Sequence, residues 1–503
     1  MKLSNTHRSL SWTFILATSI ALTVFVYLYG MPGEYVYDDF DQLTRSGLRN
    51  VFDFKNVVFN GLRQIRLWQN ITFAMNWTMT PGDLTSFKFF NLLLHLVNAV
   101  LLLRWLKILF PKPKESIAYL ATLIFLLHPL QIQSVTYVMG RISLLQAFFY
   151  LLAINVFASW ATSKMKILYV IAFLSLFAKE TCVFIPALLL FYEITIHKKE
   201  IKDIQWSKWV PFLLLPLLWI PIHSLLKDPS SLYADTSGFH LYPFFRYSCA
   251  QAYYFLFYLY LFIIPNKQSI IHSFPEESGY YSLIVLMGAV AYVGLLLYMF
   301  YGVRKHPLKT FFLGFFFLIY LPTSSIFQMI NPFAEYRLYQ TNIVLSVFFA
   351  FLLFRLSERY FKNKDMFIKS VAIFLILGMS YLTFKQCTIW RSAVAVYKQG
   401  LALYPSEHTL LNNLSAEYFR LRKYAEAEKT ILEARKYSNY LESSVSQNMY
   451  MLALAYYREN NFHKTLELLK KLDSDPARPA QFPQPFYDLK KAALEAVGAK
   501  IIK

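Results

Sequence analysis

The chain is poor in charged residues and in cysteine, and each scarcity excludes a class of protein. Asp, Glu, Lys and Arg make up 16% of the 503 residues, whereas a soluble globular protein carries about a quarter. The three cysteines, Cys182, Cys249 and Cys387, lie far apart in or beside apolar segments, which excludes a disulfide framework. The sequence also lacks a glycine-rich phosphate loop, a zinc signature and a serine-hydrolase elbow. An ordinary soluble protein is therefore not expected.

Apolar sequence is abundant instead. Hydrophobic residues make up 56% of the chain, and apolar runs close to the roughly 17–25 residues that span a bilayer recur in the first three quarters of it. The first run follows a basic start and lacks a small-residue cleavage site, so we expect a retained signal anchor. We predict an all-α fold with a polytopic membrane domain, 1–387, and a soluble domain, 388–503. The predicted spans are 11–29, 87–109, 116–128, 142–160, 166–178, 181–196, 209–225, 281–302, 310–322, 338–355 and 367–386.

The formal net charge of +20 reports topology rather than nucleic-acid binding. Cytoplasmic loops of membrane proteins are enriched in Lys and Arg. The aromatic segment 247–264 complicates the count, because the loops at 304–309 and 355–369 lie outside if it crosses and inside if it is interfacial. Its aromatic density favours an interfacial helix, which places the soluble domain outside. The basic stretches lie at Lys2 and Arg8, and at 104–114, 164–166, 198–208, 304–309 and 355–369.

Two adjacent carboxylates, Asp38 and Asp39, follow the first span. Charge at a membrane surface is costly, so this pair is a candidate catalytic site. The alternative is that both are solvated carboxylates that cap a helix. The pair lies in a long outer loop, 31–86, which we expect to hold surface helices at 51–59 and 68–79.

Three cations are expected at the same outer face: Arg141, Lys179 and Arg337. Guanidinium and ammonium groups there suit the phosphate of a lipid-linked substrate. The alternatives are snorkelling of Arg141 to the lipid headgroups and mutual neutralisation of Lys179 and Glu180. Glu335 lies two residues before Arg337, where helical side chains diverge, so each is expected to have a partner elsewhere.

Polar residues line one face of the second span. Asn91, His95 and Asn98 have i, i+4 and i+7 spacing, which predicts interhelical hydrogen bonds rather than catalysis. Arg66 in the outer loop and Tyr339 beyond Arg337 are expected, with His95, to support the site.

The soluble domain contains an internal repeat. Small residues at its packing positions allow close helix crossing, so we predict a tetratricopeptide α-solenoid of two full repeats and a half. On its concave surface Asn412, Asn413 and Tyr418 are candidate peptide contacts, or else they only cap and pack the repeat. The packing positions are Ala393, Tyr397, Gly400 and Pro405, then Leu411, Leu414, Tyr418, Ala427, Ile431 and Ala434, then Met449, Leu452, Ala453, Tyr456, Thr465, Leu469 and Leu472.

Together the motifs resemble the transmembrane and tetratricopeptide-repeat-containing O-mannosyltransferases, relatives of the protein O-mannosyltransferases and other GT-C glycosyltransferases. The resemblance covers essentially the whole chain. It implies inverting transfer of a sugar from a polyprenyl-phosphate donor to a hydroxyl, with no cofactor and with a divalent metal not excluded. The motifs that carry it are Asp38-Asp39, Asn91-x3-His95, His128-Pro129 before Gly140-Arg141, Lys179-Glu180 before Pro186, and Ala334-Glu335-x-Arg337-x-Tyr339.

The resemblance also implies roles. Asp38 or Asp39 would act as general base while its neighbour orients the acceptor, and Arg141, Lys179 and Arg337 would stabilise the departing phosphate. This chain departs from the family where Gln133 replaces a frequent acid and where Ile142-Ser143 replaces Ala followed by an acid.

The short repeat array resembles that of bacterial members, which implies a bacterial inner membrane with periplasmic repeats. The alternative is the endoplasmic reticulum membrane with lumenal repeats. The expected acceptor is Ser or Thr of a protein held by the repeats, and nucleic acid is not an expected partner. The alternative function is a non-catalytic membrane scaffold that recruits envelope components, although a scaffold needs neither the carboxylate pair nor the outer cations.

Overall fold

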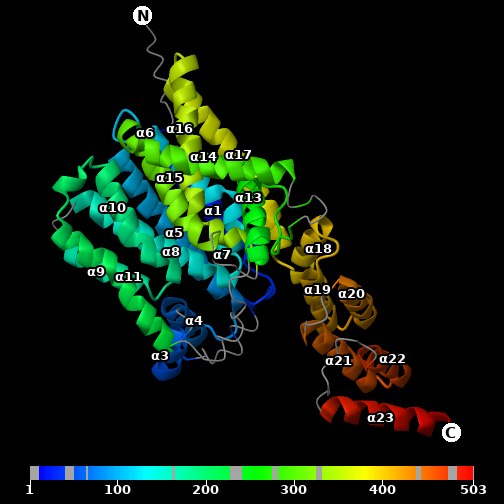
Figure 1. The fold of residues 1–503 in the computed structure, drawn as a ribbon. Coiled ribbons are helices and arrows are strands. Elements are labelled where there is room, and N and C mark those ends of the chain that lie inside the picture. The colour runs from blue at the N-terminus through cyan, green and yellow to red at the C-terminus, as the bar shows by residue number, and fades with distance from the viewer. Residues whose placement is uncertain are drawn as a thin grey trace, which may run out of the picture. The chain divides into compact units, whose positions relative to one another are not determined.

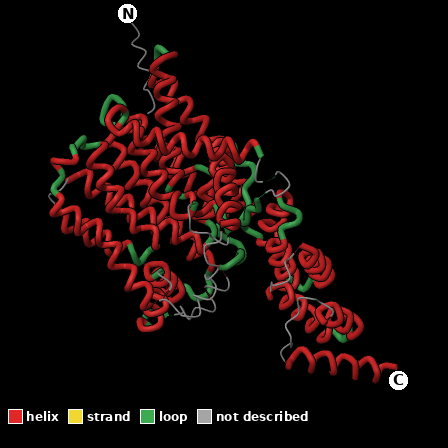
Figure 2. The backbone as a smooth tube through the Cα atoms, viewed as in Figure 1, coloured by secondary structure: helices red, strands yellow, loops and turns green. Residues whose placement is uncertain are grey.

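The computed structural model is helical throughout the residues that it describes (Figure 1). Figure 2 shows these helices joined by loops, with no strand in the described part of the chain. The predicted all-α fold is therefore confirmed. The structure describes residues 11–39, 43, 50–63, 66–160, 165–226, 241–274, 279, 282–324, 331–437, 443–473 and 484–501.

The chain divides into two compact units. The membrane unit comprises Met1–Gln268 and Phe274–Arg391, and the C-terminal unit comprises Ser269–Ser273 and Ser392–Lys503. A five-residue piece from the middle of the chain is thus part of the C-terminal unit.

Each of the eleven predicted spans coincides with one helix of the membrane unit. Several of these helices begin with a side-chain cap or with proline at the first turn, as isolated helix ends require. They are α1 (Trp12–Gly30), α5 (Leu84–Leu109), α6 (Glu115–Leu127), α8 (Arg141–Trp160), α9 (Met165–Ser175), α10 (Ile185–Thr195), α11 (Trp206–Leu226), α14 (Leu283–Lys305), α15 (Pro307–Tyr320), α16 (Thr341–Tyr360) and α17 (Lys364–Ile389).

Fewer helices than eleven are long enough to cross a bilayer alone. Among the described residues six qualify by length and composition, or seven if α6 and the bent segment Pro129–Val135 form one span. A straight crossing needs about 20 residues, whereas α9 has 11 and α15 has 14. The protein is an integral membrane protein in which several apolar helices are shorter than a straight bilayer crossing requires.

The basic loops gather at one end of the membrane unit, which we call the basic end. Trp105, near the end of α5, contacts Phe311 at the start of α15, with ring centroids 6.0 Å apart. Tyr192, near the end of α10, contacts the same ring at 5.1 Å. Phe351 of α16 lines one small cavity with Lys309 of α15. The stretches 104–114, 198–208, 304–309 and 355–369 therefore share this end, while Lys2, Arg8 and Lys164 lie outside the described residues.

The opposite end, which we call the loop end, is crossed by α13 (Leu241–Ile263). Gln251 of this helix donates to the Pro332 carbonyl at 2.9 Å, and Phe262 stacks on His128 at 4.5 Å. Pro332 precedes α16 and His128 follows α6, so both contacts are made at the loop end. That the aromatic segment lies at the interface instead of crossing the membrane stays a prediction.

The outer loop contributes two short helices at the loop end. α4 (Leu67–Met79) lies where it was predicted, but α3 (Phe54–Arg63) begins three residues later than expected. The reason is a turn in which the Asn50 side chain accepts from the Phe52 N–H at 2.9 Å and Asp53 caps the following helix.

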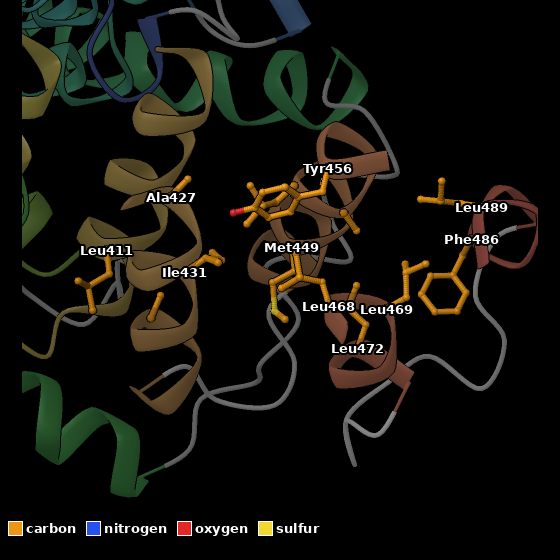
Figure 3. Close-up of a cluster of buried hydrophobic side chains, with 13 residues drawn as sticks. Leu411, Ala427, Ile431, Met449, Tyr456, Leu468, Leu469, Leu472, Phe486 and Leu489 are labelled. Carbon is orange, nitrogen blue, oxygen red and sulfur yellow. The ribbon is translucent and has the colours of Figure 1, made fainter. Parts of the chain in front are cut away.

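The C-terminal unit consists of helical hairpins around one apolar cluster (Figure 3). Ala427, Ala434 and Ala453 are fully buried at helix crossings. The helices are α18 (Ala393–Leu403), α19 (His408–Arg420), α20 (Tyr424–Tyr437), α21 (Ser443–Arg458), α22 (Phe462–Asp473) and α23 (Gln484–Ile501). Ser415 of α19 donates to the Ala427 carbonyl of α20 at 2.8 Å, and Thr465 of α22 donates to the Ala453 carbonyl of α21 at 3.2 Å, so the two helices of each hairpin are linked at equivalent positions by hydrogen bonds of opposite direction.

Candidate active site at the loop end

The two adjacent carboxylates occupy different environments. Asp38 is exposed, whereas only 1% of Asp39 is exposed. Asp39 accepts hydrogen bonds from the Val36 N–H at 3.3 Å and from the Met139 N–H at 3.2 Å. Asp39 therefore ties the loop after α1 to the segment before α8, and Asp38 is the carboxylate that the solvent side presents.

Burial governs the ionisation of Asp39. Loss of solvation raises the pKa of Asp39 to about 7, against lowering by the backbone donor Val36 and by the positive charge of Lys88. Lys88 is the fifth residue of α5 and is only 2% exposed. It was not among the predicted site residues, and the only sequence signal is a single Lys at the start of an apolar span.

The backbone at Tyr37 is held in an uncommon conformation. Its φ of +56° lies in the left-handed region that non-glycine residues seldom adopt, and such outliers cluster at functional sites. The Asn331 amide lies 3.5 Å from the Tyr37 hydroxyl. The Asn331 carbonyl in turn accepts from the Arg337 guanidinium at 2.7 Å. These contacts link the loop that carries Asp38 to Arg337.

A cluster of three cations lies at the same end, formed by Lys179, Arg337 and Arg66. Burial lowers the pKa of Lys179 to about 8; Glu180 opposes this shift, while Arg337 and Arg66 add to it. Lys179 is therefore still a cation at neutral pH. These three like charges repel one another, and a polyanionic group bound between them would offset that repulsion. The cluster is therefore suited to bind such a group.

The first turn of α4 is fixed to the end of α9. The Trp68 indole N–H donates to the Leu174 carbonyl at 2.8 Å, and the Trp68 backbone N–H donates to the Phe177 carbonyl at 3.4 Å. Arg66 precedes this anchor by two residues and Lys179 follows it by two. The pair of hydrogen bonds explains how residues more than a hundred positions apart come to share one cluster.

Arg141 is placed differently from the other predicted cations. Its side chain is fully buried, and its three nitrogens donate to Asn91, Asn76 and the Phe87 carbonyl, each at 2.8 Å. The guanidinium is also covered by the rings of Phe73 and Phe90, 4.4 and 4.6 Å from their centroids. The geometry favours a role for Arg141 in joining α4, α5 and α8.

The preceding glycine has a packing reason. A Cβ on Gly140 would lie 2.4 Å from the Gln133 carbonyl oxygen, so only glycine fits there. In this structure Gly140 and Arg141 both serve packing between neighbouring segments.

Most of the polar face of α5 is hydrogen-bonded within the protein, as predicted, while the Asn98 side-chain oxygen has no partner among the described residues. His95 bonds to the Tyr339 hydroxyl at 2.7 Å and to the Leu126 carbonyl at 3.1 Å. Asn91 donates to the Tyr137 carbonyl at 3.2 Å, and Asn98 to the Leu144 carbonyl at 3.0 Å. Through these hydrogen bonds His95 and Tyr339 hold α5, α6 and the segment before α16 together.

The two acidic supporting residues diverge. Glu335 is fully buried and accepts from the Gln268 amide at 3.2 Å. Arg337 bonds elsewhere, so the predicted separation of this pair is confirmed. Glu180 is exposed beside Lys179.

The predicted peptide contacts lie in the C-terminal unit. Asn412 is 8% exposed, and its side-chain oxygen accepts from Asn448 at 2.8 Å. Asn413 donates to the Thr409 carbonyl at 2.8 Å. Tyr418 packs against the apolar cluster, with the Lys398 ammonium 5.8 Å from its ring centroid. Asn413 and Tyr418 keep more accessible surface than Asn412.

Within the described residues no three His, Cys, Asp or Glu side chains converge to hold a metal ion. The loop end offers an exposed carboxylate, a buried carboxylate with a lysine, and three cations.

The fold and this site define a class: an all-α integral membrane protein with buried and clustered charge at one end, followed by helical hairpins. Within that class the chain is similar to protein O-mannosyl-transferase F38B6.6 of Caenorhabditis elegans, at 22% identity over 421 residues. It is also similar to protein O-mannosyl-transferase TMTC3 of Homo sapiens, at 35% identity over 94 residues. No family model and no solved structure matches the chain.

The matches cover unequal parts of the proteins. The nematode match covers 78% of this chain and 58% of the relative, and the human match covers 19% and 10%. The chain thus spans less than two thirds of the length of either relative. Both relatives are animal proteins, so they give no support to the expected bacterial source.

Proposed function

We propose that this protein is a glycosyltransferase that moves a sugar from a polyprenyl-phosphate donor to a Ser or Thr hydroxyl of a protein, with inversion at the anomeric carbon. The observation that carries the proposal is that the exposed Asp38 lies at the same end of the membrane unit as a three-cation cluster. The names of both relatives, protein O-mannosyl-transferases, support it.

Asp38 is the general base. It accepts the proton of the acceptor hydroxyl as that oxygen bonds to the anomeric carbon from the face opposite the phosphate. Asp39 holds the loop through its two backbone hydrogen bonds and so keeps Asp38 in place. The exposed carboxylate reacts and the buried one positions it.

The cation cluster stabilises the leaving group. When the bond between the anomeric carbon and the phosphate oxygen breaks, the electron pair remains on that oxygen. Lys179, Arg337 and Arg66 lie where this charge would be neutralised. Arg141, with three nitrogens bonded within the protein, is assigned to the framework instead.

The reaction takes place on the non-cytoplasmic face. The basic stretches occupy the basic end, which positive-inside topology places in the cytoplasm, and Asp38 lies at the loop end. α17 ends at the loop end, because Gly30 and Cys387 are in contact there. Ser392 begins the C-terminal unit five residues later, so that unit is on the same face.

The C-terminal unit selects the acceptor. Its hairpins bury the positions expected of a tetratricopeptide array, and such arrays present extended surfaces to peptides. Asn413 and Tyr418 are the proposed contacts. Asn412 is not one of them, because its side chain is buried and accepts a hydrogen bond from Asn448.

The test reconstitutes the full-length protein into vesicles that contain radiolabelled polyprenyl-phosphate-mannose, with polyprenyl-phosphate-glucose as a comparison. We expect label to pass to Ser or Thr of added unfolded protein and to be released by β-elimination. A change of Asn413 and Tyr418 to Ala should lower transfer to protein while donor hydrolysis continues.

Label that stays in the lipid fraction with every acceptor would contradict the enzymatic proposal and favour a scaffold. Label transferred to lipid or glycan hydroxyls, and not to protein, would retain the chemistry but exclude the assigned acceptor.

A further inference from the structure

Lys88 is a buried charge at the loop end that has no role in the proposed mechanism. Lys88 is 2% exposed, yet its ammonium has no hydrogen-bond partner among the described residues. Burying an ammonium costs several kcal/mol unless an opposite charge compensates. A lysine in this buried position therefore needs a compensating anion nearby.

The surroundings of Lys88 supply that anion. Its ammonium interacts electrostatically with Asp39, Cys387 and Glu34, and a Cβ on Gly33 would lie 3.0 Å from it. The lysine thus lies against the loop 31–39 that carries both carboxylates. Cys387 belongs to α17, so three separate parts of the chain meet around this ammonium.

Asp39 faces few other ionisable groups. Two tyrosines interact electrostatically with Asp39: Tyr35 from the same loop and Tyr137 from the segment before α8. Burial, and to a smaller extent the charge of Asp39, raises the pKa of both phenols. Neither phenol is charged at neutral pH. Lys88 from α5 is the positive group that acts on Asp39.

We propose that Lys88 is the buried counter-charge of Asp39, a positioning residue that favours the ionised form of this carboxylate and thereby helps to hold the turn Val36–Asp39, which carries Asp38. An ionised Asp39 accepts from the Val36 and Met139 N–H groups with both oxygens. A protonated carboxyl keeps only one good acceptor oxygen, so the turn loses one of its two anchors.

The relevance of the turn to catalysis rests on the proposed function, but the counter-charge itself does not. A direct test follows the protonation of Asp39 by infrared spectroscopy of the full-length protein across a pH series. The protonated-carboxyl band that disappears in Asp39→Asn is the signal. Lys88→Met should move the pH at which this band vanishes upward by about 1–3 units, and Lys88→Arg should leave it close to the native value.

Lys107→Met is the matched control, since this lysine lies on the same helix but is 39% exposed and pairs with Glu115 at 2.9 Å. It should leave the Asp39 band unchanged. An unshifted midpoint in Lys88→Met, or an equal shift in Lys107→Met, would overturn the proposal.

If Lys88→Met alone is destabilised or does not fold, the double variant with Asp39→Asn removes both charges and should be more stable than Lys88→Met, which is measured as the amount of folded protein and its melting temperature. A double variant no more stable than Lys88→Met would equally overturn the counter-charge. A band shift without any effect on glycosyl transfer would keep the charge pair and reject only its link to catalysis.

Discussion

The two ends of the membrane unit use charge in opposite ways. At the basic end most ion pairs are exposed and join close neighbours in sequence, as Lys202 does with Glu200 and Arg355 with Glu358, while Glu193, buried and paired with Lys199, is an exception. At the loop end Asp39 and Lys88 are buried. Exposed pairs contribute little to stability, whereas buried charges are costly and are retained where they have a specific role. The basic end reports topology, and the loop end is where chemistry is expected.

The largest expected difference between the ends concerns a single carboxylate. Asp38→Asn should lower glycosyl transfer by about 10²–10⁴-fold, because a general base contributes about that much. Asp365→Asn is the matched control, since Asp365 is an exposed carboxylate at the basic end that pairs with Lys369 at 2.5 Å. Transfer rates in vesicles that contain equal amounts of each variant provide the comparison. Equal rates for the two variants would remove Asp38 from the reaction.

The cations should show the next largest difference. Lys179→Ala or Arg337→Ala should lower turnover by about 10²–10³-fold, since loss of one donor to developing charge costs about 2.7–4 kcal/mol. Lys202→Ala, which removes an exposed lysine at the basic end, should have no effect on turnover. If all three variants keep the native rate, the phosphate does not bind at the cluster.

A change at Arg141 should affect the stability of the protein, whereas changes at Lys179 and Arg337 should affect its turnover. Arg141→Lys offers one nitrogen where arginine offers three, so it cannot reach all three acceptors and leaves at least one oxygen unsatisfied, at a cost of about 1–3 kcal/mol. We expect a lower melting temperature in detergent, and reduced transfer only in proportion to the folded protein that remains. Normal stability with lost turnover would return Arg141 to the phosphate site.

The smallest expected effect is a pH dependence of stability. The pKa of Asp39 in the folded protein is about 7, above its ordinary value. Between pH 4 and 7 the folded state therefore binds this proton more tightly than the unfolded state, and its contribution to stability falls as pH rises. Melting temperatures across this range should fall less steeply in Asp39→Asn than in the native protein. Identical slopes would show that Asp39 titrates normally.

Much of the architecture could be predicted from the sequence because apolar run length and basic loops are local signals. The eleven predicted spans each match a helix, and Asn91, His95 and Asn98 bond between helices as their spacing indicates. The number of full-length crossings could not be predicted. An apolar segment such as the one that forms α9 predicts a span, and only the structure shows that its helix has 11 residues.

The site could be predicted only in part. The sequence indicates which charges exist but not which are buried, so it could not separate Asp38 from Asp39 or Arg141 from Arg337. Those differences come from tertiary contacts, such as the N–H of Met139 that reaches Asp39 from a hundred residues away. A lone Lys88 in an apolar span also carries no pattern that identifies a partner.

The location of the donor sugar tests the comparison between the ends most directly. A polyprenyl-phosphate-mannose with a photoreactive group on the sugar can be bound to the full-length protein in vesicles, irradiated, and traced by mass spectrometry of the cross-linked peptides. We predict labelled peptides from 31–39, 177–184 and 331–339, all at the loop end. Label confined to 104–114, 198–208 or 304–309 at the basic end would contradict the account.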